Sequence, residues 1–312
     1  MRKILRIVLK FLAGLVIAIA LFLAIVYVVN LISNKSEQGK IQPYGQLVPV
    51  DGKNMNVLIQ GKGEETVVLL PGYGTGAPAL DFKPLVEELS PFYKVVVIEP
   101  FGYGLSDRTG KERSTANIVS EIHAALQQLQ IDHYTLMGHS IAGIYGLDYV
   151  NKYADEVNAF VGIDSSVPTQ GGMDEELPVK TLELLDKSGL MRLLKKISGD
   201  PYAGLPFDTE IKEQMRMISN KNSSNATVMN EMEHISSNFE AAKALTFPKN
   251  LPLLLFVQAN NTDVEGWLPL HEGQVKDSVH GKVITLEGGH YLHHTRYKEI
   301  ARDFRAFMEE SQ

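Results

Sequence analysis

The chain has 312 residues, of which 44% are hydrophobic and 21% are charged, and its formal net charge is −7. This length can bury one large core together with a smaller additional unit. The lack of cysteine excludes a disulfide framework, a thiolate nucleophile and cysteine-ligated metal sites. The acidic balance disfavours a nucleic-acid partner, because affinity for phosphates depends largely on basic side chains.

The first 29 residues predict a membrane anchor. Residues 11–29 carry no charge, and as a helix they would span about 29 Å, close to the roughly 30 Å hydrocarbon core of a bilayer. The basic residues of segment 1–10 put the N-terminus in the cytoplasm and the body outside, as a single-pass protein of bacterial type. A cleaved, secreted form is the alternative, since residues 18–20 (Ala-Ile-Ala) resemble a signal-peptidase site. Polar residues 30–43 predict a short tether.

Further along the chain, short apolar runs alternate with segments of helical length. Residues 47–50 and 54–60 flank Asp51-Gly52, which predicts a hairpin. The alternation after it predicts a mostly parallel sheet of about eight strands with helices on both faces. The later strands are expected at 66–70, 95–99, 134–138, 159–164, 253–258 and 283–287.

The gap between the sixth and seventh strands is too long for one crossover. Helix-like stretches at 179–197, 209–219 and 226–244 predict a helical segment between two parts of the core, 44–165 and 249–312. Six methionines in this segment could line an adaptable apolar substrate pocket or could simply pack between helices. They are Met173, Met191, Met215, Met217, Met229 and Met232.

The segment Gly138-His139-Ser140-Ile141-Ala142-Gly143 follows an expected strand and precedes an expected helix. It has the pattern of a nucleophile elbow, in which a serine occupies a turn so tight that its neighbours must be small. Alanine stands at 142 where glycine is usual, and it satisfies the same steric demand. Ser140 is therefore the candidate nucleophile, and His139 is expected to point away from it.

Together with three further motifs, the elbow identifies the chain as similar to the α/β-hydrolases of the esterase, lipase and peptidase type over about residues 44–310. Leu-Pro-Gly-Tyr-Gly at 70–74 resembles the oxyanion loop, and residues 102–107 (Gly-Tyr-Gly-Leu-Ser-Asp) resemble the turn after the fourth strand. Gly288-Gly289-His290 resembles the loop of the catalytic histidine. The resemblance implies a Ser-His-Asp triad and an oxyanion hole formed by the backbone amides of Tyr73 and Ile141. It also implies that the helical segment, residues 166–248, is a helical cap inserted into the core.

His290 is the expected base, and three carboxylates are candidates for the acid that orients it. Asp263 is preferred because it fits the order serine, aspartate, histidine along the chain. Asp164, at the end of the sixth strand, is the alternative acid, and Glu265 is a third. His293 and His294 raise the possibility of a metal cluster, but a helix beginning near them predicts ordinary surface residues. No metal or cofactor is expected.

These motifs predict a membrane-anchored serine hydrolase that cleaves an ester or other acyl bond of a small-molecule or lipid-like substrate through an acyl-enzyme. A small-peptide hydrolase of aminopeptidase type is the first alternative, with the acidic run 174–176 (Asp-Glu-Glu) as a binding site for an amine. The second alternative is a non-catalytic surface-binding protein that retains the hydrolase scaffold.

Overall fold

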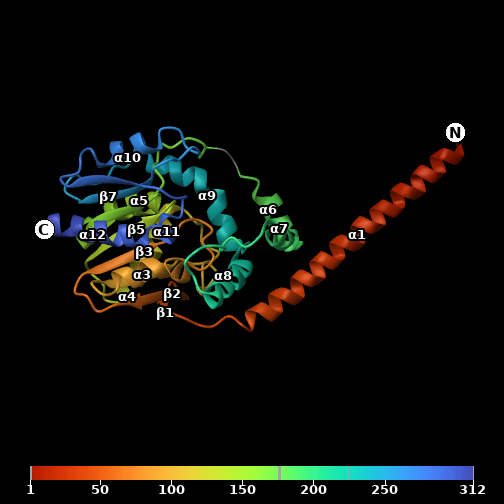
Figure 1. Cartoon of the computed structure of the whole chain (residues 1–312), viewed down its shortest axis with the longest axis horizontal. Helices are drawn as coiled ribbons and strands as arrows, with labels where there is room; N and C mark the ends of the chain where they lie inside the picture. Colours follow the sequence, from red (N-terminus) through yellow and green to blue (C-terminus); the bar gives the residue numbers. More distant parts are fainter. Residues whose placement is uncertain (1, 175–176, 224, 312) are drawn as a thin grey trace.

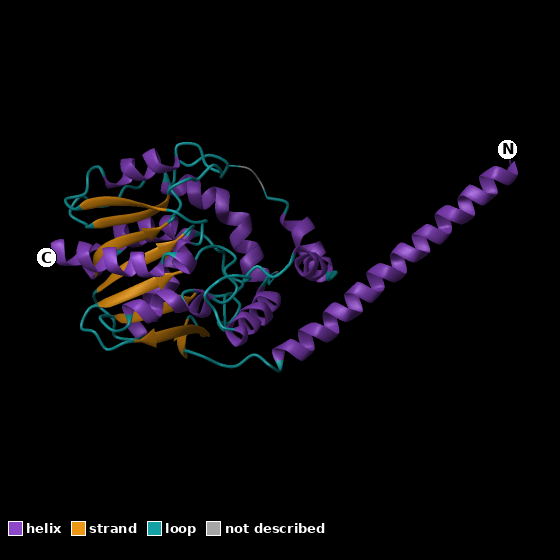
Figure 2. Ribbon diagram, viewed as in Figure 1, coloured by secondary structure: helices purple, strands orange, loops and turns teal. Residues whose placement is uncertain are grey.

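One eight-stranded sheet forms the centre of the molecule (Figure 2). The computed structural model describes residues 2–174, 177–223 and 225–311. The strand order is β1-β2-β4-β3-β5-β6-β7-β8; β2 runs antiparallel to both β1 and β4, and the remaining pairs are parallel. The expected mostly parallel sheet is therefore confirmed. The strands are β1 (Gln46–Val50), β2 (Lys53–Gln60), β3 (Thr66–Leu70), β4 (Lys94–Glu99), β5 (Tyr134–His139), β6 (Val157–Ile163), β7 (Leu253–Gln258) and β8 (Gly281–Leu286).

The predicted hairpin joins β1 to β2. Asp51 and Gly52 both take positive φ, at 50° and 75°. This conformation matches the right-handed twist of the flanking strands, and it is why an Asp-Gly pair favours a two-residue turn.

The central strands are buried on both faces, and each face has its own core. In β3, Val68 and Leu70 belong to one apolar cluster, while Val67 and Leu69 belong to the other. Successive side chains of a strand point to opposite sides, so a strand that feeds two cores must be apolar throughout. The helices around the sheet are α2 (Pro78–Asp81), α3 (Lys83–Leu89), α4 (Thr115–Gln128), α5 (Ala142–Lys152), the 3₁₀ turn η1 (Ala154–Glu156), α10 (Trp267–Val275), α11 (Leu292–Thr295) and α12 (Tyr297–Glu310).

Four helices connect β6 to β7 and lie at one end of the sheet (Figure 1). Gly189, with φ of 83°, divides the stretch predicted as one helix at 179–197 into two. The side chains of Asp208 and Asn225 cap the next two helices by accepting hydrogen bonds from their first backbone amides. The four are α6 (Val179–Lys187), α7 (Leu190–Ser198), α8 (Thr209–Asn222) and α9 (Ala226–Ala242).

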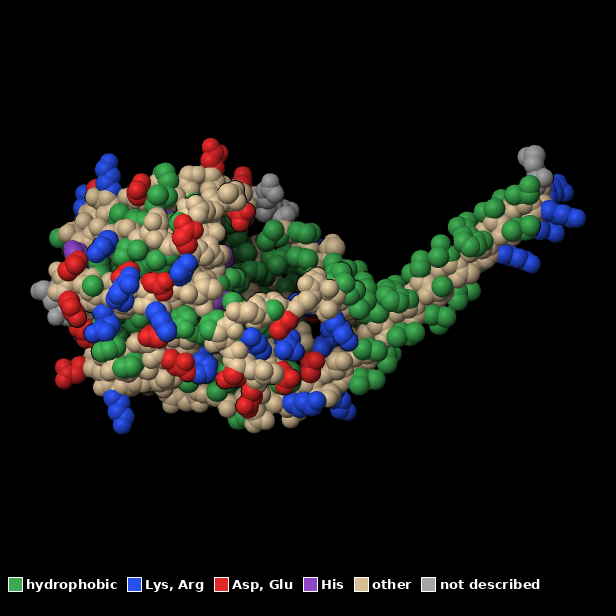
Figure 3. Space-filling model, viewed as in Figure 1, with side chains coloured by type: hydrophobic (Ala, Val, Ile, Leu, Met, Phe, Trp, Pro, Cys, Tyr) green, Lys and Arg blue, Asp and Glu red, His purple; other side chains and the backbone are tan. Residues whose placement is uncertain are grey.

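A single long helix, α1 (Arg2–Gln38), projects from the body (Figure 1). Among the described residues it alone is long and apolar enough to cross a membrane, judged by length and composition. Apolar side chains cover it, with basic ones at its far end (Figure 3). The helix continues through most of the segment predicted as a tether, because no proline and no glycine interrupts residues 15–38. Only residues 39–45 connect it to β1.

Candidate active site

Ser140 lies on a sharp turn between β5 and α5. Its φ is +54°, in the left-handed region that a non-glycine residue rarely occupies. Three backbone hydrogen bonds hold it there: its carbonyl accepts from Ser166 N–H at 2.8 Å and from Gly143 N–H at 2.9 Å, and its amide donates to the Ile163 carbonyl at 3.3 Å. A strained residue persists only where its surroundings fix it in this way.

Small neighbours are a steric requirement of this turn. A methyl group on Gly143 would lie 2.4 Å from the Ser166 carbonyl oxygen, and one on Gly138 would lie 2.9 Å from the Ala142 Cβ. Ala142 itself is fully buried at the start of α5. The position two residues after the serine therefore accommodates a methyl group, whereas positions 138 and 143 do not.

His290 pairs with Asp164. The His290 Nδ1 lies 2.7 Å from Asp164 Oδ2, and the aspartate side chain is fully buried while that of the histidine is 43% exposed. The other carboxylate oxygen, Oδ1, accepts from Trp267 Nε1 at 2.7 Å and from Gln258 N–H at 2.9 Å. Because a carboxylate only accepts, Nδ1 carries the proton and Nε2 is left free to accept one.

Among the described residues, neither of the two other acid candidates forms an ion pair with His290, although Asp263 lines the same cavity as Ser140 and His290. Asp263 is exposed in the loop after β7, where its amide donates to Asn261 Oδ1 at 2.9 Å. Within the described ranges its carboxylate forms no hydrogen bond or ion pair with His290, and Glu265 is also exposed. The preference for Asp263 therefore disagrees with the geometry. The side chain of Asn261 holds this loop by accepting hydrogen bonds from the amides of Asp263 and Val264.

The expected oxyanion loop passes close to the serine. A methyl on Gly72 would lie 3.0 Å from Ser140 Cβ and 2.7 Å from His139 Nδ1, so only glycine allows this approach. The amides of Tyr73 and Ile141 form no hydrogen bond with any residue that the structure describes. Both amides are therefore available to an oxyanion.

A buried polar group supports the loop from behind. Gly74 N–H donates to the Tyr103 hydroxyl at 3.3 Å, and this hydroxyl in turn donates to Glu231 at 2.9 Å. Tyr145 donates to the other Glu231 oxygen at 2.7 Å. Burial raises the pKa of the Glu231 carboxyl, and the two tyrosine hydrogen bonds partly oppose that shift. Sequence reasoning did not find this group, since Glu231 lies in α9, far along the chain from the motifs.

Ser140 and His290 open into one cavity of about 290 Å³. Tyr73 and Ile141 also line it, together with the apolar side chains of Met173, Ile235, Phe239, Val264 and Trp267. The methionines of the insert divide between both predicted roles. Met173 lines this cavity, Met191, Met229 and Met232 line a neighbouring one, and Met215 is buried among apolar neighbours.

His293 and His294 are buried, so the prediction that they are surface residues is wrong. Each donates from Nε2 to a different oxygen of Asp81 in α2, at 2.7 and 2.9 Å. These hydrogen bonds hold the pKa of the Asp81 carboxyl well below its usual range, although burial by itself would raise it. The three ligand atoms also lie close enough together to bind a metal ion, but the hydrogen bonds account for the arrangement without one.

Through Asp81, His293 and His294, α2 is joined to α11, which begins two residues after His290. His139, whose ring lies 4.6 Å from that of His293, donates from Nε2 to the carbonyl oxygen of His290 at 3.1 Å. His139, the neighbour of Ser140, therefore supports the backbone at His290. No local signal in the sequence predicts this, because Asp81 and His293 are 212 residues apart.

Known proteins share this architecture. The model of the alpha/beta hydrolase fold family matches residues 65–248. The uncharacterized protein YbdG of Bacillus subtilis is 32% identical over 262 residues, which is 81% of this chain and 79% of that protein. The 2-hydroxy-6-oxononadienedioate/2-hydroxy-6-oxononatrienedioate hydrolase of Escherichia coli K12 is 31% identical over 127 residues, 39% of this chain and 42% of its own length.

A solved structure agrees at the level of the fold. The enol-lactonase of Burkholderia xenovorans LB400 superimposes with a TM-score of 0.62 at 15% identity, over 85% of this chain and 100% of that one. The family match covers more than half of the chain, and the sheet has the architecture that the motifs predict. This protein belongs to the alpha/beta hydrolase fold family.

Proposed function

We propose that the chain is a serine hydrolase that cleaves an ester or other acyl bond through an acyl-enzyme, with Ser140 as nucleophile, His290 as base and Asp164 as the acid that orients the base. The observation that carries this proposal is the 2.7 Å contact between His290 Nδ1 and the buried Asp164, beside the cavity that Ser140 and His290 share. Asp164 replaces Asp263 in the proposed triad.

The proposed reaction has two halves. Ser140 Oγ attacks the acyl carbon while His290 Nε2 takes its proton, and the amides of Tyr73 and Ile141 stabilise the oxyanion. The bond to the leaving group breaks as His290 returns the proton to the departing oxygen or nitrogen. Water then attacks the acyl-enzyme with the same base, which releases the acid and restores the serine. No cofactor enters either half.

Ester chemistry is favoured over peptide cleavage. Of the acidic run, Asp174 is exposed, and Glu175 and Glu176 lie outside the described residues. Half of the residues that line the cavity beside Ser140 are apolar, which suits an acyl group. The enol-lactonase that shares the fold is, by its name, an enzyme acting on a lactone.

We further propose that α1 anchors the protein in the cell membrane, with the N-terminus in the cytoplasm and the hydrolase outside. The charge-free run 11–29 and the four basic residues before it support this topology. The chain has no cysteine, so a Val279→Cys variant, at an exposed position on the body, should react with a membrane-impermeant maleimide on intact cells. Labelling of this cysteine only after cell lysis would show that the body lies in the cytoplasm, the opposite of the proposed topology.

Fluorophosphonate labelling of the full chain in detergent, beside its Ser140→Ala variant, tests the proposed mechanism. We expect labelling of the first protein alone, because the reagent reacts only with an activated serine. Tight ligand binding by a folded protein that is neither labelled nor active on esters would instead favour the surface-binding alternative.

A further inference from the structure

The helical insert contacts α1 through Asn220 of α8, which donates to Glu37 at 3.3 Å, and through Arg192 of α7. Arg192 of α7 donates from Nε to Asn30 Oδ1 at 2.8 Å, from Nη2 to Glu37 at 2.9 Å, and also to Asn34. Positions 30, 34 and 37 lie on one face of α1, because they are spaced by four and three residues. The guanidinium is thereby held along two turns of the helix, and α7 is fixed beside it.

The turn between α6 and α7 reaches the apolar part of α1. A methyl on Gly189 would lie 2.6 Å from the Asn30 Cβ and 3.0 Å from the Val26 carbonyl oxygen. Val26 lies within the charge-free run 11–29, about one helical turn from its end. If that run spans the hydrocarbon core, Gly189 and the beginning of α7 lie at the level of the lipid headgroups.

The surface of the insert at this level suits a bilayer. Apolar residues of α7 recur at the three- and four-residue spacing of a helical stripe: Leu190, Leu193, Leu194 and Ile197. The side chain of Leu194 is 50% exposed and that of Ile197 is 73% exposed. Leu184 of α6 is 68% exposed. Exposed basic residues, Lys187, Lys195 and Lys196, accompany them. A helix that combines an apolar stripe with lysines is typical of the surface of an anionic membrane.

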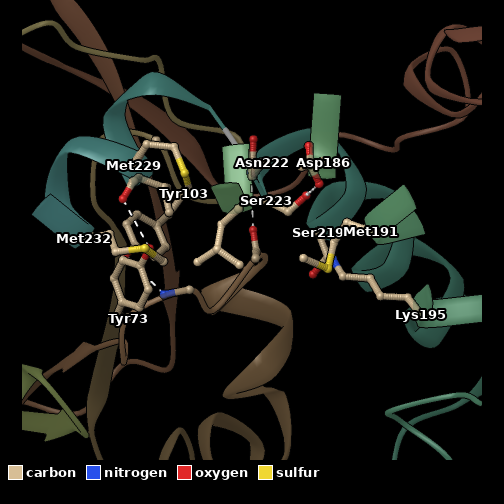
Figure 4. A pocket seen from close by; sticks show the side chains of 15 residues that line it. Tyr73, Tyr103, Asp186, Met191, Lys195, Ser219, Asn222, Ser223, Met229 and Met232 are labelled. Atoms are coloured by element: carbon tan, nitrogen blue, oxygen red, sulfur yellow. Dashed lines mark hydrogen bonds between the residues drawn. The ribbon is translucent and has the colours of Figure 1, made fainter. Parts of the chain in front are cut away.

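A second cavity lies beside α6 and α7 and shares the lining residue Tyr73 with the cavity of Ser140. It has a volume of about 230 Å³, and Leu182, Met191, Met229 and Met232 line it. In Figure 4 the side chains of Met191 and Lys195 lie on one side of it, and those of Tyr73, Met229 and Met232 lie on the other. Tyr73 lines both cavities, and Figure 3 shows apolar side chains around the hollow beside α6 and α7.

We infer that α6 and α7 dock on the anionic bilayer surface crossed by α1, and that the substrate is a long-chain lipid ester whose acyl chain enters from that surface past Tyr73 to Ser140. The inference rests on the proposed serine hydrolase function and adds its substrate class. In this arrangement Arg192 holds α7 beside α1, and the apolar stripe of α7 contacts the bilayer. The second cavity then leads the acyl chain from the headgroup region toward Ser140.

The test compares two esters with the same leaving group. The full chain is reconstituted in vesicles of phosphatidylcholine and phosphatidylglycerol, with 4-methylumbelliferyl oleate in the bilayer or 4-methylumbelliferyl acetate in solution. We expect the double variant Leu194→Glu/Ile197→Glu to hydrolyse the oleate ester about tenfold more slowly, because it no longer buries large aliphatic side chains in lipid. The same variant should hydrolyse the soluble acetate ester at the wild-type rate. Val279→Glu, at a position 74% exposed beside β8, is the matched control and should retain both rates.

Two results would overturn the inference while leaving the serine hydrolase intact. They are an undiminished oleate rate in the double variant, and wild-type protein that hydrolyses acetate but never oleate. Failure of the proposed function itself is distinguishable, since wild-type protein would then hydrolyse neither ester and Ser140 would not react with fluorophosphonate.

Discussion

Replacing Asp164, the proposed acid, is the most direct test of the proposed triad. The Asp164 carboxylate accepts three hydrogen bonds, from Gln258 N–H at 2.9 Å, Trp267 Nε1 at 2.7 Å and His290 Nδ1 at 2.7 Å. Asparagine supplies one carbonyl oxygen and one NH₂ group in the same space. If the NH₂ group turns to His290, the imidazole must take its other tautomer, and Nε2 can no longer accept the serine proton.

We expect Asp164→Asn to lower turnover by about 10⁴-fold, the usual cost of the wrong tautomer, which corresponds to about 5 kcal/mol of transition-state stabilisation. Asp263→Asn changes an exposed side chain, and exposed substitutions usually alter free energies by at most about 0.5 kcal/mol, or about twofold in rate. The two variants should therefore differ by more than three orders of magnitude.

The assay is hydrolysis of 4-methylumbelliferyl acetate, together with the rate of fluorophosphonate labelling. Thermal unfolding of each variant shows whether the protein is folded, because Asp164 is fully buried and its replacement also alters the hydrogen bonds to Gln258 and Trp267. A larger loss in folded Asp263→Asn than in folded Asp164→Asn would refute the assignment of the acid.

Three further predictions follow from the same geometry. Ser140→Ala and His290→Ala should each reduce turnover by about a millionfold, with little further loss in the double variant; additive losses would contradict a shared mechanism. Gly143→Ala should lower the melting temperature and the labelling rate, since its methyl would lie 2.4 Å from the Ser166 oxygen, whereas Gly289→Ala, with open space around it, should do neither. Burial lowers the pKa values of His139 and His293, so below about pH 6.5 the unfolded chain binds protons that the folded one does not. The free energy of unfolding, measured by urea titration, should therefore fall by up to about 1.4 kcal/mol per pH unit for each histidine between about pH 6.5 and pH 5.5, and a flat profile would show that neither is buried neutral.

Much of the fold could be predicted from the sequence because its signals are local. The alternation of apolar runs and helical segments predicted the mostly parallel sheet, and Asp51-Gly52 predicted the hairpin between β1 and β2. Glycines at 138 and 143 around Ser140 predicted the elbow, since the steric demand falls on adjacent residues. The limits of α1 were less well predicted, because polar residues 30–38 continue as helix where their side chains contact α7.

The sequence by itself determined the candidate nucleophile, the candidate base and the long apolar helix, for each of which a few consecutive residues carry the pattern. Only the tertiary structure decided which carboxylate contacts His290, because Asp164 and Asp263 both follow strands, and among the described residues it is Asp164 that hydrogen-bonds to the imidazole. It also decided that Asp81 pairs with His293 and His294, and that Arg192 contacts α1. These contacts join residues that are more than a hundred positions apart in the sequence. They form only when the sheet and its helices pack together, so no local sequence pattern predicts them.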